Sequence, residues 1–194
     1  MTRNLITVDD LDRDEIERYL SLTDRFAEVM QRDLKKVPTL RGRTVVNLFF
    51  ESSTRTATSF ELAGKRLSAD VINVKGSGSS VDKGETLKDT VLTLNAYRPD
   101  VLVIRHKSVG ACAAAARYTD AAIVNAGDGT HAHPTQSLLD LYTLRRRGVS
   151  LEGLHVAYVG DVMHSRVARS GAAAFRTMGA KVTFIAPPTL LPPG

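Results

Sequence analysis

The sequence predicts an α/β fold in which helices flank a parallel sheet. Over residues 44–147, short apolar segments alternate with segments of helical periodicity, the order typical of a parallel sheet. Polar clusters follow these apolar segments at residues 52–56, 105–106 and 131–136. Because ligands of such sheets bind beyond the carboxyl ends of the strands, we expect the three clusters to form one site.

The chain opens with a segment that suits an amphipathic helix. Residues 9–33 are predicted to be helical, and one side of this helix is apolar. The expected buried residues are Leu11, Ile16, Leu20, Leu22, Phe26 and Met30. A basic connector over residues 35–43 then leads to the first strand.

The stretch from Phe49 to Thr56 joins this strand, predicted over residues 44–50, to a helix that extends to about Ser68. Such a turn directs unpaired backbone N–H groups and the positive end of a helix dipole at one point. Its side-chain hydroxyls come from Ser52, Ser53, Thr54 and Thr56. Together with the guanidinium of Arg55, they predict an anion site, and phosphate is the expected anion.

The remaining elements of the first unit continue the alternation. Strands are expected over residues 71–74, 101–104 and 122–125, and helices over residues 85–97, 110–118 and 134–147. Pro134 occupies the first helical turn, where its missing N–H is not needed. The Gly/Ser loop over residues 75–84 carries Ser79, Ser80 and Lys83. Its composition fits a solvated loop and a mobile, phosphate-seeking lid equally well.

A second unit begins near residue 150. Strands are predicted over residues 155–159 and 181–185, with a helix over 165–178 between them. Two strands and one helix cannot bury a core unaided, so we expect residues 150–194 to be an incomplete domain beside a first domain of residues 1–149. The turn at Gly160 lacks the Gly-x-Gly-x-x-Gly pattern, so a dinucleotide site is not expected.

Composition indicates a soluble, globular protein. Of the 194 residues, 43% are hydrophobic and 24% are charged, and no apolar run approaches the roughly 20 residues of a membrane span. The N-terminus does not resemble a signal peptide, so a cytoplasmic protein is expected. The lone Cys112 cannot form an internal disulfide and is predicted to be a core residue.

The net charge of +5 allows a nucleic-acid partner, but the basic residues are scattered. The single run, residues 145–147, closes a predicted helix and is read as a solvated helix end. An anionic small substrate accounts for the charge equally well.

Three further residues are candidates for the site. Arg105 ends an apolar strand, where it is either a second anion clamp or a solvated charge. His133 could donate a hydrogen bond to a carbonyl oxygen, and Gln136 to an amide or carbonyl group. His106 and His131 are interpreted as structural, and the histidines give only weak support for a metal because no cysteine or carboxylate spacing accompanies them.

Several motifs follow one another in the order found in aspartate carbamoyltransferase catalytic chains, which the sequence resembles over nearly its whole length. These motifs are Ser53-Thr54-Arg55-Thr56, the segment 83–90 that begins Lys83-Gly84-Glu85, Arg105-His106, His133-Pro134-Thr135-Gln136, and the segment 160–170 that contains His164-Ser165-Arg166.

The resemblance implies transfer of a carbamoyl group from carbamoyl phosphate to L-aspartate in pyrimidine biosynthesis, without a cofactor, metal or covalent nucleophile. Residues 53–56 would hold the phosphate, and Arg105, His133 and Gln136 would contact the carbamoyl part. Arg166, with Arg105 and Lys83, would bind aspartate. Lys83 and either Ser79 or Ser80 would come from a neighbouring chain, because the family's active sites lie between the subunits of a trimer.

Two departures from the family pattern affect these expectations. Ala57 stands where the family usually has arginine, and the family's second domain continues well beyond Gly194. We therefore expect weak binding of carbamoyl phosphate or phosphate and poor catalysis. The sequence does not indicate whether a regulatory chain or dihydroorotase associates.

Three alternatives remain. Ornithine carbamoyltransferase shares the phosphate motif, but an arginine at position 166 suits the carboxylates of aspartate better than the cationic amine of ornithine. A non-catalytic paralogue that serves as an assembly or binding subunit is the second. A nucleic-acid-binding protein is the weakest.

Overall fold

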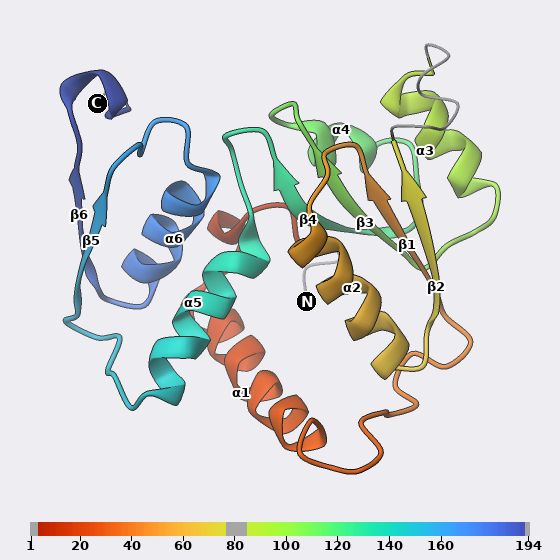
Figure 1. Ribbon diagram of the computed structural model, residues 1–194, viewed down its shortest axis with the longest axis horizontal. Coiled ribbons are helices and arrows are strands. Elements are labelled where there is room, and N and C mark those ends of the chain that lie inside the picture. Colours follow the sequence, from red (N-terminus) through yellow and green to blue (C-terminus); the bar gives the residue numbers. More distant parts are fainter. Residues whose placement is uncertain (1–3, 77–84, 193–194) are drawn as a thin grey trace.

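The larger of the two sheets that the structure describes has four parallel strands. The computed structural model describes residues 4–76 and 85–192. Its strands lie in the order β2-β1-β3-β4, all parallel, and they have the bounds β1 (Thr44–Phe49), β2 (Asp70–Lys75), β3 (Val101–His106) and β4 (Ala122–Asp128). The strands point toward the same edge of the sheet (Figure 1). The predicted parallel α/β fold is confirmed.

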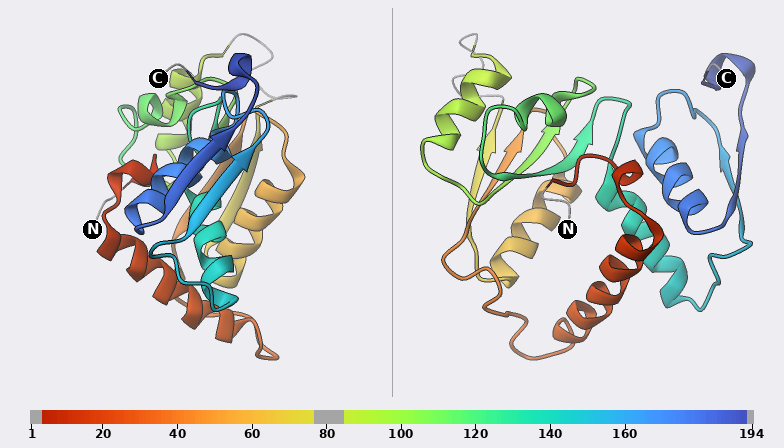
Figure 2. Two further views of the ribbon diagram at one scale, coloured as in Figure 1. Left: turned by 90° about the vertical axis from the view of Figure 1, so that its left-hand side faces the viewer. Right: turned by 180° about the vertical axis from the view of Figure 1, so that it is seen from behind.

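Helices cover both faces of this sheet, because the side chains of β1 alternate between two apolar layers. Val45 and Phe49 pack toward α2 (Thr54–Arg66), in a cluster that includes Phe60. Val46 and Leu48 lie in the opposite layer, with α3 (Leu87–Asn95) and α4 (Ala111–Ala115). Figure 2 shows α2 on one face of the sheet and α3 and α4 on the other.

The free edge of β4 is covered by the N-terminal segment. Leu5 forms a parallel bridge with Val124, and the side chain of Asn4 accepts a hydrogen bond from the Ile123 N–H at 2.9 Å. The backbone groups of β4 that face away from β3 are therefore partly satisfied by the chain itself.

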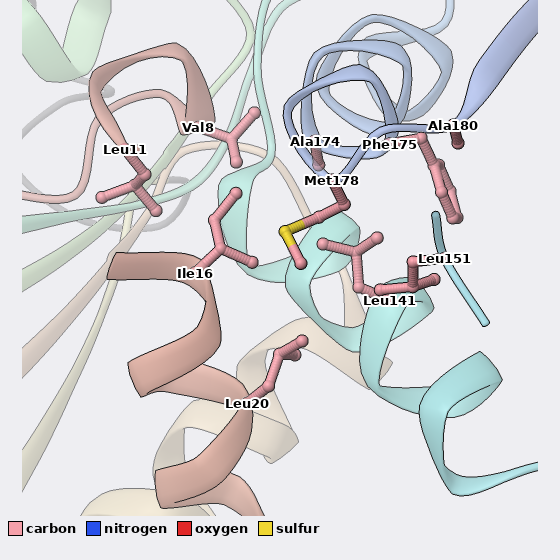
Figure 3. Packing of buried hydrophobic residues seen from close by; sticks show 10 residues of the cluster. All are labelled: Val8, Leu11, Ile16, Leu20, Leu141, Leu151, Ala174, Phe175, Met178 and Ala180. Carbon is pink, nitrogen blue, oxygen red and sulfur yellow. The ribbon is translucent and has the colours of Figure 1, made fainter. Parts of the chain in front are cut away.

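A second core joins three helices beside the sheet. These helices are α1 (Arg13–Val29), α5 (Pro134–Arg146) and α6 (Arg166–Thr177). Figure 3 shows the buried side chains that they share, which are Val8, Leu11, Ile16, Leu20, Leu141, Leu151, Ala174, Phe175, Met178 and Ala180. This cluster includes residues from both sides of the predicted domain boundary at residue 150, so the two units pack together.

Beyond α6 lie two parallel strands, β5 (His155–Val159) and β6 (Lys181–Ile185) (Figure 1). They form a sheet of their own, as the sequence indicated. The division into domains at residue 150 stays a prediction.

The first predicted helix was too long at both ends. Residues 8–10 form a short 3₁₀ turn, and α1 begins after Asp12, which accepts a hydrogen bond from the Glu15 N–H at 2.8 Å and so caps the helix. The prediction that Leu22 is buried was wrong: this residue is 43% exposed, on the outer side of α1.

Other boundaries also differ from prediction. β3 extends through Arg105 and His106, and β4 extends to Asp128, which the sequence placed in a turn. The helices α3 and α4 are shorter than expected, and α4 begins after Gly110, whose φ is +78°. Cys112 is fully buried, as predicted.

The arginine run at the end of α5 is only partly a solvated helix end. Arg145 donates to Glu17 at 3.0 Å and lies 3.1 Å from a carboxylate oxygen of Asp24, so it ties α5 to α1. Arg146 and Arg147 are exposed.

Candidate functional site

The first half of the candidate site lies where β1 passes into α2. Phe49 is in register with Arg105 of β3, so the turn after β1 lies next to the end of β3. Ser53 caps α2: its hydroxyl accepts from the Thr56 N–H at 3.4 Å and donates to the Thr56 hydroxyl at 3.0 Å. Thr54 and Arg55 follow in the first turn of α2 and are exposed. The phosphate-binding role of residues 53–56 stays a prediction.

The second half of the site is a pair of arginines that share one carboxylate. Arg105, on β3, donates to Glu51 Oε1 at 2.9 Å, and Arg166, at the start of α6, donates to both oxygens of Glu51 at 3.0 Å. Burial alone would raise the pKa of Glu51, but the hydrogen bonds and charges of Arg166 and Arg105 hold it below its ordinary value. The negative charge of Glu51 therefore offsets the repulsion between the Arg105 and Arg166 guanidiniums and holds them close together.

Both guanidiniums retain donors that no described residue uses. Arg105 Nε and Arg166 Nη1 are buried and have no hydrogen-bond partner in the part of the chain that the structure describes. Arg105 Nη1 donates to the carbonyl oxygen of Ala126 at 3.2 Å. Because an unpaired buried N–H group costs free energy, these donors favour the arrival of an anionic or carbonyl-bearing ligand.

Gly127, near the end of β4, makes room for the two arginines. Its φ is +115°, and a Cβ at this position would lie 2.7 Å from Arg166 Nη1 and 3.1 Å from Arg105 Nη1. Only glycine combines this backbone conformation with such a close approach.

Replacing Gly127 with alanine is therefore expected to displace the arginines and to weaken ligand binding by about tenfold or more, since two charge-assisted contacts would be disturbed. Titration calorimetry with inorganic phosphate and with phosphonoacetamide would measure the loss. Gly160→Ala is the matched control: Gly160 has a φ of +117°, but no atom of the described residues lies within 4 Å of the place that a Cβ would take. Equal losses in both variants would show that backbone strain alone is responsible.

His133 precedes α5 and is buried, with 7% of its surface exposed. Its backbone N–H donates to the hydroxyl of Ser170 in α6 at 2.8 Å, and its ring Nδ1 lies 3.3 Å from the Thr135 hydroxyl. Burial, followed by the charges of Arg105 and Arg166, lowers the pKa of His133 to about 4. The imidazole is therefore neutral near pH 7.

Gln136 lies in the first turn of α5, and its side chain contacts a residue of the same helix. Its side-chain nitrogen donates to Asp140 Oδ1 at 3.0 Å. Burial is the larger influence on Asp140 and raises its pKa, whereas this hydrogen bond acts in the opposite direction. The contact with Asp140 therefore fixes the orientation of the Gln136 amide.

The structure thus brings together some, but not all, of the predicted site residues. Arg105, His133 and Arg166 belong to one electrostatic cluster, in which both arginines act on the imidazole. Ser79, Ser80 and Lys83 lie outside the described residues. Sequence reasoning missed Glu51 as the partner of the arginines and Ser170 as the partner of His133. Glu51 lies within the stretch from Phe49 to Thr56, and Ser170 lies within the motif at residues 160–170, so both had a signal in the sequence. Their partners could not be predicted, because Ser170 lies 37 residues from His133 and Glu51 lies 115 residues from Arg166.

Two general properties of the described residues bear on the function. No helix in residues 4–76 or 85–192 is long and apolar enough to cross a membrane. Within those same ranges, no group of three or more histidine, cysteine, aspartate or glutamate side chains is placed to hold a metal ion.

Comparison with known proteins identifies the site's family. Residues 3–146 match the family model described as aspartate/ornithine carbamoyltransferase, carbamoyl-P binding domain. The aspartate carbamoyltransferase catalytic subunit of Kineococcus radiotolerans is 60% identical over 99% of this chain and 62% of its own length. That of Magnetococcus marinus is 59% identical over 98% of this chain and 59% of its own length. The chain therefore spans about 60% of the length of these curated relatives.

Solved structures give the same result. Aspartate transcarbamoylase from Trypanosoma cruzi, in complex with carbamoyl phosphate and aspartate, superposes with a TM-score of 0.90 at 35% identity, over 96% of this chain and 59% of that one. The catalytic subunit from M. jannaschii superposes with a TM-score of 0.87 at 37% identity, over 99% of this chain and 63% of that one. The chain belongs to the aspartate/ornithine carbamoyltransferase family.

Proposed function

We propose that this chain binds carbamoyl phosphate and serves in the transfer of its carbamoyl group to L-aspartate, giving N-carbamoyl-L-aspartate and phosphate. One observation carries the proposal: two partly buried arginines, each with a buried donor that no described residue uses, meet beside a buried, neutral histidine at the carboxyl edge of a parallel sheet. The identity to aspartate carbamoyltransferase catalytic subunits supports the choice of reaction.

The phosphate of the substrate would be held at the start of α2. The hydroxyls of Ser53, Thr54 and Thr56, the first N–H groups of the helix and the Arg55 guanidinium can all donate to phosphate oxygens. Phosphate is also the leaving group, and negative charge grows on it as the carbon–oxygen bond breaks. The fixed donors at this position would stabilise that charge without reorganisation.

Arg105 and His133 would donate hydrogen bonds to the carbonyl oxygen of the carbamoyl group. When the aspartate amine attacks the carbamoyl carbon, this oxygen gains negative charge. The Nδ1 of the neutral imidazole lies 3.3 Å from the Thr135 hydroxyl. In the tautomer in which Nδ1 accepts from this hydroxyl, the ring hydrogen is on Nε2, where it can donate to the carbamoyl oxygen. Gln136 would contact the amide end of the same group.

Arg166 would bind a carboxylate of aspartate, aided by Arg105 and by Lys83. Its Nη2 donates to both oxygens of Glu51, whereas its buried Nη1 has no partner among the described residues and is the donor that a carboxylate of aspartate would use. Holding both anionic substrates in one place supplies the proximity that a two-substrate reaction requires.

The neutral state of His133 predicts a pH-dependent stability. Because the pKa is about 4 in the folded chain and near 6.5 when unfolded, protonation favours the unfolded state. The contribution is fully present above pH 6.5, and about 3 kcal/mol of it is lost as the pH falls to 4. Urea unfolding between pH 4 and 7 should show this slope in the native chain and a flatter curve in His133→Gln. Parallel curves would contradict the assignment.

Arg166 allows a direct test of the proposed acceptor. The native chain is expected to bind N-phosphonacetyl-L-aspartate about tenfold or more tightly than phosphonoacetamide, because a charge-assisted pair with the aspartyl carboxylate is added. Arg166→Gln should reduce this preference while phosphonoacetamide binding changes less. Equal affinity of the native chain for the two compounds, or a preference for the ornithine counterpart, would exclude the aspartate assignment.

A non-catalytic binding subunit is the second candidate, and Ala57 is the observation that favours it. Ala57 packs against the apolar layer between α2 and the sheet, at the position where the family usually has arginine. Failure to bind either phosphonate would support this reading. The proposal has three further parts. The first is a homotrimer with shared sites, in which Lys83 and either Ser80 or Ser79 come from a neighbouring chain. The others are a cytoplasmic location and a place in pyrimidine biosynthesis.

A further inference from the structure

Two buried polar side chains at the end of β4 have no part in the reaction described above. Asn125 and Asp128 are both 0% exposed. A buried carboxylate costs free energy unless donors surround it, and an apolar residue in its place would avoid that cost. Their contacts therefore indicate what these polar groups contribute.

Asp128, the last residue of β4, connects the start of α4 to the turn that follows β4. Its Oδ2 accepts from the Gly110 N–H at 2.8 Å, at the start of α4. Its Oδ1 accepts from the Ala132 N–H at 3.0 Å, in the turn just before His133. His131 Nδ1 lies 3.1 Å from Oδ2 and is a third group in contact with this carboxylate. The carboxylate thus holds the turn over residues 129–133 against the start of α4.

Asn125 extends this network toward the arginines. Its Nδ2 donates to Asp128 Oδ1 at 2.8 Å and to the carbonyl oxygen of Ile6 at 2.9 Å. Its Oδ1 accepts from the N–H of Gly127 at 2.8 Å. Asn125 therefore fixes the backbone of the glycine beside which the two guanidiniums lie.

The network consequently controls both sides of the carbonyl-binding half of the site. On one side, it fixes the residues around Gly127, including Ala126, whose carbonyl oxygen accepts from Arg105. On the other side, it fixes Ala132, which precedes His133. None of these hydrogen bonds involves a residue at the start of α2, where phosphate would bind.

We propose that Asn125 and Asp128 are positioning residues that set the place of the Arg105 guanidinium relative to the His133 imidazole, and so determine recognition of the carbamoyl group but not of phosphate. This inference rests on the proposed function. It distinguishes the two halves of the substrate: the carbamoyl contacts depend on the β4 network, and the phosphate contacts depend on the β1–α2 turn.

Asp128→Asn tests this division, because asparagine has one acceptor oxygen where aspartate has two, so either the Gly110 or the Ala132 N–H loses its acceptor. Titration calorimetry would compare phosphonoacetamide with inorganic phosphate. We expect the native chain to prefer phosphonoacetamide by about tenfold, the order of one charge-assisted hydrogen bond. In Asp128→Asn this preference should fall to about twofold, while phosphate affinity stays within about twofold of the native value. Asp120→Asn makes the same chemical change on the surface and should alter neither.

A second measurement does not depend on any ligand. Histidine-labelled NMR titration reports the pKa of His133, which is set by burial and by the facing charges of Arg105, Arg166 and Glu51. We expect this pKa to rise in Asp128→Asn, as the imidazole leaves its place, and to stay unchanged in Asp120→Asn. Where Asp128→Asn fails to fold, Asn125→Ser weakens the same network and should give smaller shifts in the same directions.

The outcomes separate the inference from the proposed function. A native chain without any preference for phosphonoacetamide would contradict the proposed function, and the His133 titration would still test the network. An unchanged preference together with an unchanged His133 pKa in a folded Asp128→Asn would overturn the positioning role. An equal loss of phosphate affinity would overturn the division between the two halves.

Discussion

Arg105→Gln is expected to reduce phosphonoacetamide affinity by about tenfold, the order of one charge-assisted hydrogen bond, and carbamoyl transfer by about 10²-fold to 10³-fold, the range for losing a charged donor at a developing oxyanion. Arg105 is 13% exposed in its side chain, and it contacts Glu51 and the Ala126 carbonyl oxygen while its Nε donor stays unused by the described residues. Glutamine keeps the length of the first part of this side chain but has no charge and cannot make these contacts together.

The loss should be specific to the site and not general to the sheet. Arg43 provides the control, since it lies just before β1, at the opposite edge of the same sheet, and donates to Asp100 at 2.6 Å. Its side chain is 63% exposed, so Arg43→Gln should change binding by less than about twofold, as expected for surface pairs. Comparable losses in the two variants, measured by calorimetry and by formation of carbamoyl aspartate, would remove Arg105 from the proposed site.

The fold could be predicted from the sequence because its signals are local. Apolar segments such as 44–50, followed by helical periodicity, specify each strand and helix without knowledge of the others. The boundaries could not be predicted as well. Tertiary pairing extends β3 to His106 and β4 to Asp128, and a local capping hydrogen bond at Asp12 delays the start of α1. Leu22 was assigned to the core on spacing alone, although the packing of α1 leaves it outside.

The candidate site, too, could be predicted only in part from the sequence. Residues with a distinctive chemistry at strand ends, such as Arg105 and His133, were identified because parallel strands end at one edge. Residues that support them were not. Asn125 and Asp128 act through backbone N–H groups of other segments, and Glu51 acts through an arginine 115 residues away. Contacts of this kind depend on the folded arrangement and leave no periodic pattern in the chain.

Leu141→Ala is expected to lower the free energy of unfolding by about 2–5 kcal/mol, the range for truncating a large aliphatic side chain in a packed core. Leu141 is fully buried on α5, within the cluster shared with α1 and α6 (Figure 3). Three helices close around this side chain, so a cavity cannot collapse by moving one of them alone. Urea denaturation followed by circular dichroism would measure the loss.

Leu139→Ala is the matched control, because Leu139 lies on the same helix two residues earlier and is 53% exposed. It should change the free energy of unfolding by less than about 0.5 kcal/mol, as surface substitutions usually do. The shared cluster also predicts that the whole described chain unfolds together when Leu141 is truncated. Residues 8–20 and 174–180 contribute to one core, so Leu141→Ala should shift a single cooperative transition. If residues 150–192 instead unfolded in a separate, earlier step that the substitution left unchanged, the packing of α6 on α5 would contribute little to stability.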